Sequence, residues 1–186
     1  MDRFETYYRT LYSVARVVNS SLDPAKVLEE IAQAAAKAMN AKACTLRLLD
    51  RTGQHLLASA TFGLSKAYLR KGPVDVAKSG LDREVLAGKV ATIKDVSSDP
   101  RFQYPEQAKA EGIHSILVAP LSVEGKSIGV LRIYLGEVRD FAASEVEFLT
   151  AIADLSALAI ENARLHQALK KDYDMLAAFE HRIFED

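Results

Sequence analysis

Two apolar runs joined by a four-residue connection constrain the fold of this chain most strongly. Residues 115–123 read "SILVAPLSV" and residues 128–135 read "IGVLRIYL", with "EGKS" between them. Runs of this length around a short glycine-containing connection are typical of a β-hairpin that is buried in a sheet. Arg132 is the one charged residue of the second run, so a permanent cation lies in an otherwise apolar strand.

The remaining pattern predicts an α+β fold. A second hairpin is expected from "CTLRLLD", the turn "RTGQ" and "HLLASATF", a further short strand from "VATIKDV", and a sixth strand near "GPVDVA". Asp23 followed by Pro24 is typical of the start of a helix, which precedes these strands. Helices, then strands, then a helix indicate a central antiparallel sheet of five to six strands.

A long helix is predicted for residues 144–186, which contain neither proline nor glycine. Ser144 and Glu147 have the spacing of a capping box, and forty-odd residues at about 1.5 Å each would span roughly 60 Å. Its second half has a coiled-coil repeat with alternating spacings of four and three, formed by Leu158, Asn162, Leu165, Leu169, Asp172, Leu176, Phe179 and Ile183.

We expect this helix to form a parallel homodimer. An N-terminal helix over residues 1–20 has an apolar stripe, and we expect it to join the long helix in a helical bundle. The predicted dimer interface comprises Leu11, Val14, Val18, Leu158, Leu165, Leu169, Leu176 and Phe179. The alternative is that the long helix folds back on its own domain.

Composition excludes several classes of protein. The 24 Lys and Arg residues nearly balance 25 Asp and Glu residues, and no basic run occurs, so nucleic-acid binding is not expected. No apolar segment approaches the roughly 20 residues of a membrane span, and the N-terminus does not resemble a signal peptide, so we expect a cytoplasmic protein without a membrane partner. The single cysteine, Cys44, lies in an apolar run, which is typical of a buried thiol.

The sequence resembles the GAF domain family, the sensory domains of cyclic-nucleotide phosphodiesterases, phytochromes and bacterial signalling proteins. The resemblance covers residues 21–165 and depends on the order of three segments: the helix and strand that start at "SLDPAKVLEE", the loop "VATIKDVSSDPRF", and "SILVAPLSVEGKSIGVLRIY" leading into "FAASEVEFL". It implies a sheet with the first and last helices on one face and a ligand cavity on the other. The short helices and loops of residues 64–112 would form the roof of that cavity.

No enzymatic or cofactor site is evident in the sequence. The four histidines are scattered, and nucleophile–base pairs, paired carboxylates or a metal cluster are not found in recognisable spacing. The family's methionine-sulfoxide reductases need several cysteines, and its bilin-binding members attach the chromophore to a cysteine in another position. The motif that supports cyclic-nucleotide binding is incomplete here, although Asp95 and Phe102 fall in the corresponding region.

The cavity face can be assigned from the alternation of side chains along a strand. Val130, Arg132 and Tyr134 share one face of their strand, while the all-apolar alternate set must lie under the helices. In the family's sheet the first and last strands resemble neighbours, so Arg47 should project from the same face as Arg132. The expected ligand-binding residues are Arg47, Phe62, Asp95, Phe102, Tyr104, Val118, Arg132 and Tyr134.

Two buried guanidiniums require negative charge nearby, because an unmatched buried charge costs several kcal/mol. One possibility is an internal carboxylate, with Asp95, Glu106 and Glu111 as candidates, and the other is a bound anion. The sequence therefore predicts a non-catalytic sensory domain that binds a small, possibly anionic ligand and acts on a separate or missing output domain. The alternative is a ligand-free dimerisation or docking module.

Overall fold

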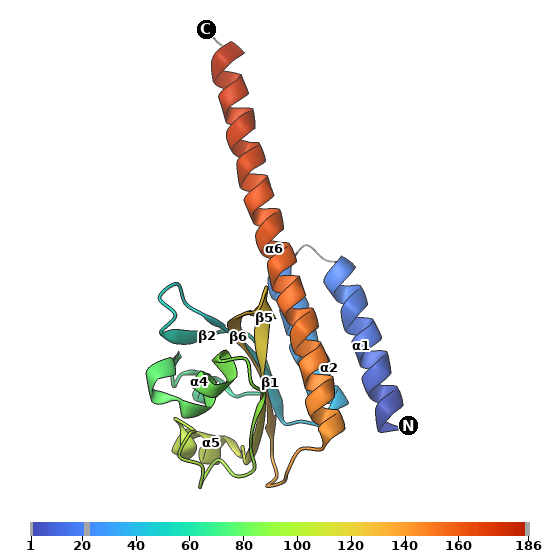
Figure 1. The fold of residues 1–186 in the computed structure, drawn as a ribbon, viewed down its shortest axis with the longest axis vertical. Helices are drawn as coiled ribbons and strands as arrows, with labels where there is room; N and C mark the ends of the chain where they lie inside the picture. Colours follow the sequence, from blue (N-terminus) through green and yellow to red (C-terminus); the bar gives the residue numbers. More distant parts are fainter. Residues whose placement is uncertain (1, 21–22, 185–186) are drawn as a thin grey trace.

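The computed structural model describes residues 2–20 and 23–184, with side chains described for all of these except residues 20 and 177–184. Over this range the chain forms an α+β fold around a six-stranded antiparallel sheet of order β3-β2-β1-β6-β5-β4 (Figure 1). The predicted fold class is confirmed, including the short strand near "GPVDVA". The strands are β1 Ala43–Leu49, β2 His55–Phe62, β3 Val74–Asp75, β4 Ala91–Ile93, β5 Ser115–Val123 and β6 Lys126–Leu135.

Helices cover both faces of this sheet. Figure 1 shows α2 and α6 on one face, with α1 on their outer side, and the short helices α4 and α5 on the other face. The helices are α1 Arg3–Ser20, α2 Pro24–Ala38, α3 Lys66–Leu69, α4 Gly80–Leu86, α5 Pro105–Glu111 and α6 Ala143–Phe184, with a 3-10 helix at Val76–Lys78. Asp23 caps α2 as predicted, because its carboxylate accepts hydrogen bonds from the amides of Ala25 and Lys26.

The pairing of β1 with β6 places the two strand arginines on one face. Thr45 pairs with Arg132, and Arg47 pairs with Val130, so both guanidiniums project away from α2 and α6. The alternate residues Leu131 and Ile133 are buried under those helices. Both assignments made from strand alternation are confirmed.

The stripe of α1 packs against its own chain. Val14 and Val18 are buried in the core that α2 and α6 share, and Leu11 is partly buried against it. The ring of Tyr7 stacks on that of Phe148 in α6, with centroids 4.1 Å apart. The burial of Val14 and Val18 is thus explained within one chain, and they are not available as the dimer interface that the sequence suggested.

The helix α6 has a buried half and an exposed half. It runs for 42 residues, or about 63 Å at 1.5 Å per residue, and extends well beyond the rest of the molecule (Figure 1). Residues such as Leu149 and Ile152 are fully buried, whereas Leu165, Leu169 and Leu176 are 59%, 70% and 66% exposed. The alternative of a helix folded back on its own domain therefore fails for the described part of the exposed half.

The cap of α6 differs from the predicted one. Glu145, rather than Glu147, accepts a hydrogen bond from the amide of Ala142, which precedes the helix. The helix thus begins at Ala143, one residue earlier than expected. Phe179 and Ile183, the last two predicted coiled-coil positions, lie outside the described side chains.

Candidate functional site

Arg132 forms a buried ion pair with a residue of the covering helix α4. Its Nη2 donates to Oδ1 of Asp82, and the two side chains are 2% and 1% exposed. Oδ2 of Asp82 accepts a hydrogen bond from Oγ of Ser79 at 2.6 Å. Burial acts to lower the pKa of Arg132, but the charge of Asp82 outweighs it and raises that pKa.

The expected carboxylate partners were therefore wrong. The side chain of Asp95 instead caps its own turn by accepting from Ser97, and Glu111 accepts hydrogen bonds from the amide and hydroxyl of Ser65. Glu106 is exposed. The sequence could have indicated that Asp82 is buried, because it lies within one turn of Leu81 and Val85 on a predicted helix and these three residues form its buried face, but it could not identify Arg132 as the partner.

Arg47 is equally buried but has no carboxylate partner among the described residues. Its side chain is 2% exposed, and its Nη1 donates to the carbonyl of Leu56 at 3.4 Å, which is a long hydrogen bond. Its Nε has no hydrogen-bond partner in the described part of the chain. A buried guanidinium with so few partners has lost its hydration, and its hydrogen bonds within the protein compensate little of that cost.

Lys71 adds a third positive charge to this compartment, and sequence reasoning did not identify it. Its Nζ lies 4.0 Å from the ring centroid of Tyr104 and 5.0 Å from that of Tyr68. Burial, and then the charges of Arg47 and Arg132, lower the pKa of Lys71 to about 7. Within the described residues, Asp82 is the one carboxylate that pairs with any of these three cations.

An open hollow lies beside Arg47 at the edge of the sheet. It has a volume of about 330 Å³ and is lined by Arg47, residues 57–61 of β2, Leu69, Gly72 and Pro73 after α3, and Glu29 of α2. The strand β3 pairs only with His55 and Leu56, so it leaves the rest of this edge of β2 open. Of the eight predicted ligand-binding residues, Arg47 is the one that lines this hollow.

The other predicted ligand-binding residues are placed differently. Phe102, Val118, Arg132 and Tyr134 are buried, the hydroxyl of Tyr104 donates to the carbonyl of Pro73, and Asp95 lies in its own turn. Phe62 was misplaced, because it pairs with Cys44 and packs against the helix-covered core. The reason is its strand position, which alternation along β2 could not fix.

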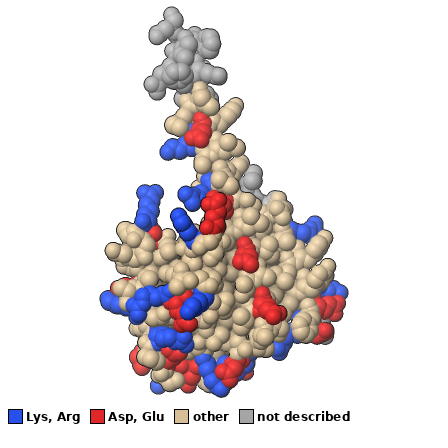
Figure 2. All heavy atoms as spheres, in the orientation of Figure 1, with Lys and Arg blue, Asp and Glu red and all other residues tan. Residues whose placement is uncertain are grey.

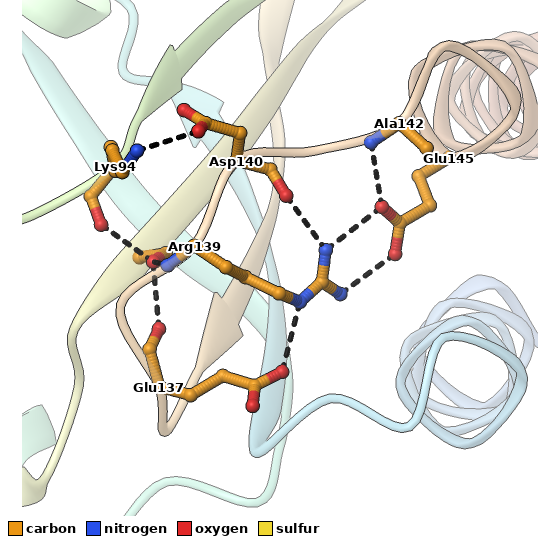
Figure 3. Close-up of polar contacts among 7 residues, drawn as sticks. Lys94, Glu137, Arg139, Asp140, Ala142 and Glu145 are labelled. Atoms are coloured by element: carbon orange, nitrogen blue, oxygen red, sulfur yellow. Dashed lines mark hydrogen bonds and ion pairs between the residues drawn. The ribbon is translucent and has the colours of Figure 1, made fainter.

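A second polar cluster connects the sheet to the start of α6 (Figure 3). Arg139 donates to both carboxylate oxygens of Glu145 at 2.9 and 2.7 Å, and its Nε donates to Glu137. The hydroxyl of Ser115 lies 2.6 Å from the carbonyl oxygen of Lys94 and 2.7 Å from that of Glu137, so it can donate its one proton to either, and it accepts from the amide of Arg139. Burial would raise the pKa of Glu145, but the hydrogen bonds from Arg139 and from the amide of Ala142 lower it.

The described residues contain no group of three or more His, Cys, Asp or Glu side chains that could hold a metal ion, and none of their helices has the length and apolar character of a membrane span. Cys44 is fully buried on the helix-covered face, and burial raises the pKa of its thiol. On the face shown in Figure 2, acidic and basic side chains are interspersed.

Comparison with known proteins agrees with this architecture. Solved GAF domains of phosphoenolpyruvate-protein phosphotransferases align with TM-scores of 0.78 (Coxiella burnetii, 22% identity, 90% of this chain and 99% of that chain) and 0.74 (Acinetobacter, 23%, 89% and 97%). A free methionine-R-sulfoxide reductase from Neisseria meningitidis, solved with its substrate, aligns at 0.75 with 18% identity over 89% of this chain and 95% of that chain. At sequence identities this low, the structural similarity establishes the fold alone.

Two curated relatives are sensors or regulators by name. The chain is 31% identical over 133 residues to a methyl sulfide methyltransferase-associated sensor from Methanosarcina acetivorans, covering 69% of this chain and 13% of that protein. It is 24% identical over 172 residues to a Nif-specific regulatory protein from Herbaspirillum seropedicae, covering 90% of this chain and 31% of that protein. The model of the GAF domain matches residues 21–161, most of the chain, and the chain therefore belongs to the GAF domain family.

Proposed function

We propose that this GAF domain is a non-catalytic sensory module, in which a small ligand binds on the side of the sheet opposite α2 and α6 and changes the position of α6. The observation that carries the proposal is a surplus of positive charge: the buried Arg47 and Arg132 and the half-buried Lys71 share one compartment, and among the described residues only the carboxylate of Asp82 pairs with any of them. An apolar core gains nothing from unmatched cations, whereas a binding site for an anion requires them.

The form of α6 supports transmission of a signal. Its first half packs on the sheet and its second half exposes leucines at heptad spacing, so one rigid element connects the domain to a surface suited to another helix. The partner that this spacing favours is a second copy of the chain, aligned in parallel. An output domain, separate or in the same protein, would then respond to the spacing of the two helices.

The dimer can be tested with a matched pair of variants. Leu169→Asp with Leu176→Asp places two negative charges on the heptad surface, and light scattering should then report a monomer. Gln167→Asp with Lys171→Gln changes the net charge by the same amount at positions outside the heptad surface, and should leave a dimer. A monomeric wild-type protein, or a dimer that survives the double leucine change, would contradict this part of the proposal.

Sensing can be tested with a spin label on α6. Gln167→Cys provides an exposed thiol, while the native Cys44 is fully buried and its pKa is raised, so labelling is selective. Electron–electron distance measurements between the two copies should change when a small-molecule ligand is added. A distance distribution that stays the same with every ligand shown to bind would favour the alternative, a structural dimerisation module.

A further inference from the structure

The hollow beside β2 combines a buried cation with apolar walls. Arg47 lines it and has an unpartnered Nε, while Leu69 and Pro73 contribute apolar surface on the same side of the sheet. Leu69 is half-buried and Pro73 is exposed, so this wall is open to a molecule from solvent. The volume of about 330 Å³ lies at the lower end of the range for small-molecule sites.

A β-bulge helps to form this hollow. Leu46 pairs with Ala60 and Arg47 pairs with Ala58, so Ser59 is an extra residue in β2 at the point where Arg47 faces the strand. A bulge of this kind changes the direction of neighbouring side chains and bends the strand. Since β3 ends its pairing at Leu56, the bulged segment stays uncovered by β3, and Arg47 lines the hollow at this edge of the sheet.

We propose that this hollow binds a small organic acid with a single carboxylate, which pairs with Arg47 while the apolar body of the acid packs against Leu69 and Pro73. The proposal rests on the sensory function above and names its ligand class. A carboxylate matches the planar donor geometry of a guanidinium and would supply the charge that Arg47 lacks. The apolar walls favour an acid with a hydrocarbon body over a sugar phosphate, whose hydroxyl groups would lose their hydrogen bonds to water.

Glu29 and Asp82 further restrict which ligands would fit this hollow. Glu29 of α2 also lines the hollow, so its negative charge would disfavour a ligand with a second negative charge. Arg132 does not compete for the ligand, because Asp82 already neutralises it. The two strand arginines thus have different roles, with Arg132 structural and Arg47 available to the ligand.

The test uses phenylacetate as the probe, with phenylacetamide and inorganic phosphate as controls, in calorimetric titrations at constant ionic strength. Phenylacetate should bind saturably, and phenylacetamide, which has the same shape without the charge, at least tenfold more weakly. Phosphate should also bind at least tenfold more weakly than phenylacetate. Equal or tighter binding of phosphate, or no saturable binding of phenylacetate, would overturn the proposed ligand class.

Two variants test the residues. Arg47→Gln should weaken phenylacetate binding at least tenfold, and circular dichroism will establish that the variant is folded. Leu69→Asp changes a half-buried residue of the wall and should weaken phenylacetate binding to a similar extent, so the test does not depend on a fully buried substitution alone. Unchanged affinity in a folded Arg47→Gln protein, or in Leu69→Asp, would overturn the assignment of the site.

The ligand proposal and the sensory proposal can fail separately. If phenylacetate binds through Arg47 but the spin-label distances on α6 stay constant, the site stands and the sensory function fails. If a different ligand moves the label and Arg47→Gln leaves that response intact, the sensory function stands and this site assignment fails.

Discussion

The buried pair of Arg132 and Asp82 makes a quantitative prediction, because the two side chains are only 2% and 1% exposed. The substitution Asp82→Asn keeps the size of the side chain and removes its charge. A guanidinium keeps its proton at neutral pH, so Arg132 would remain charged without a partner in the core. Breaking a buried pair in this way costs about 3–5 kcal/mol of unfolding free energy.

The chain supplies a matched control in Lys94 and Asp140. These residues form an ion pair at 2.7 Å, but their side chains are 60% and 75% exposed (Figure 3). Exposed pairs of this kind contribute at most about 1 kcal/mol, so Asp140→Asn should have a small effect. The difference between the two Asp→Asn changes isolates the effect of burial.

A double-mutant cycle completes the experiment. Arg132→Met with Asp82→Asn removes both charges, and its cost should lie at least about 2 kcal/mol below the sum of the two single costs. Urea unfolding followed by circular dichroism is the assay, since the chain has no tryptophan, and all variants must be compared at one protein concentration. If Asp82→Asn costs no more than Asp140→Asn, the pair is not desolvated and the assignment of Arg132 as structural is wrong.

Two further changes test ionisable groups. Glu145→Gln should lower the unfolding free energy at pH 7 by about 2 kcal/mol, because Glu145 accepts two charged hydrogen bonds from Arg139. The pKa of Glu145 is lowered in the folded protein, so in acid unfolding the difference between wild type and variant should begin to shrink below the unfolded-state pKa of about 4.3 and vanish only below the lower folded-state pKa. Lys71 has a pKa of about 7 when folded and about 10.4 when unfolded, so above pH 7 the unfolded chain binds an additional proton and stability should rise with pH, by at most about 1.4 kcal/mol per unit. Lys71→Met should remove this slope between pH 7 and 8.5 in urea unfolding, and an unchanged slope would show that Lys71 is solvated.

Strand alternation correctly predicted which side of the sheet carries Arg47 and Arg132, because side chains of a regular strand follow a period of two. Alternation alone could not assign a face to β2, and Phe62 was expected on the wrong one. Ser59 forms a bulge that shifts the register, so Phe62 lies on the helix-covered face. This bulge is not marked by any particular residue type in the sequence. Its position depends on how β2 pairs with β1.

Long-range pairing was beyond sequence reasoning for a different reason. The sequence showed that Arg132 needed a negative charge, but Asp82 lies fifty positions away in the chain, and only the packing of α4 on β6 brings them together. The stripe of α1 was similar: periodicity revealed its apolar face, but not that Val14 would pack within its own chain. Periodicity identifies a surface that must be buried, but it does not identify the surface against which it packs.

The route from the hollow to α6 can be argued from the contacts that lie between them. Arg47 lies on β1, which pairs with β6, and β6 leads through Glu137 to Arg139, whose guanidinium is fixed by Glu145 at the start of α6. A connection held by several hydrogen bonds passes on a displacement that a loose loop would absorb. The variant Glu145→Gln should therefore leave phenylacetate affinity within twofold of wild type, yet reduce the ligand-induced change in the spin-label distance. An undiminished change would show that the signal reaches α6 through the packing of β5 and α2 instead.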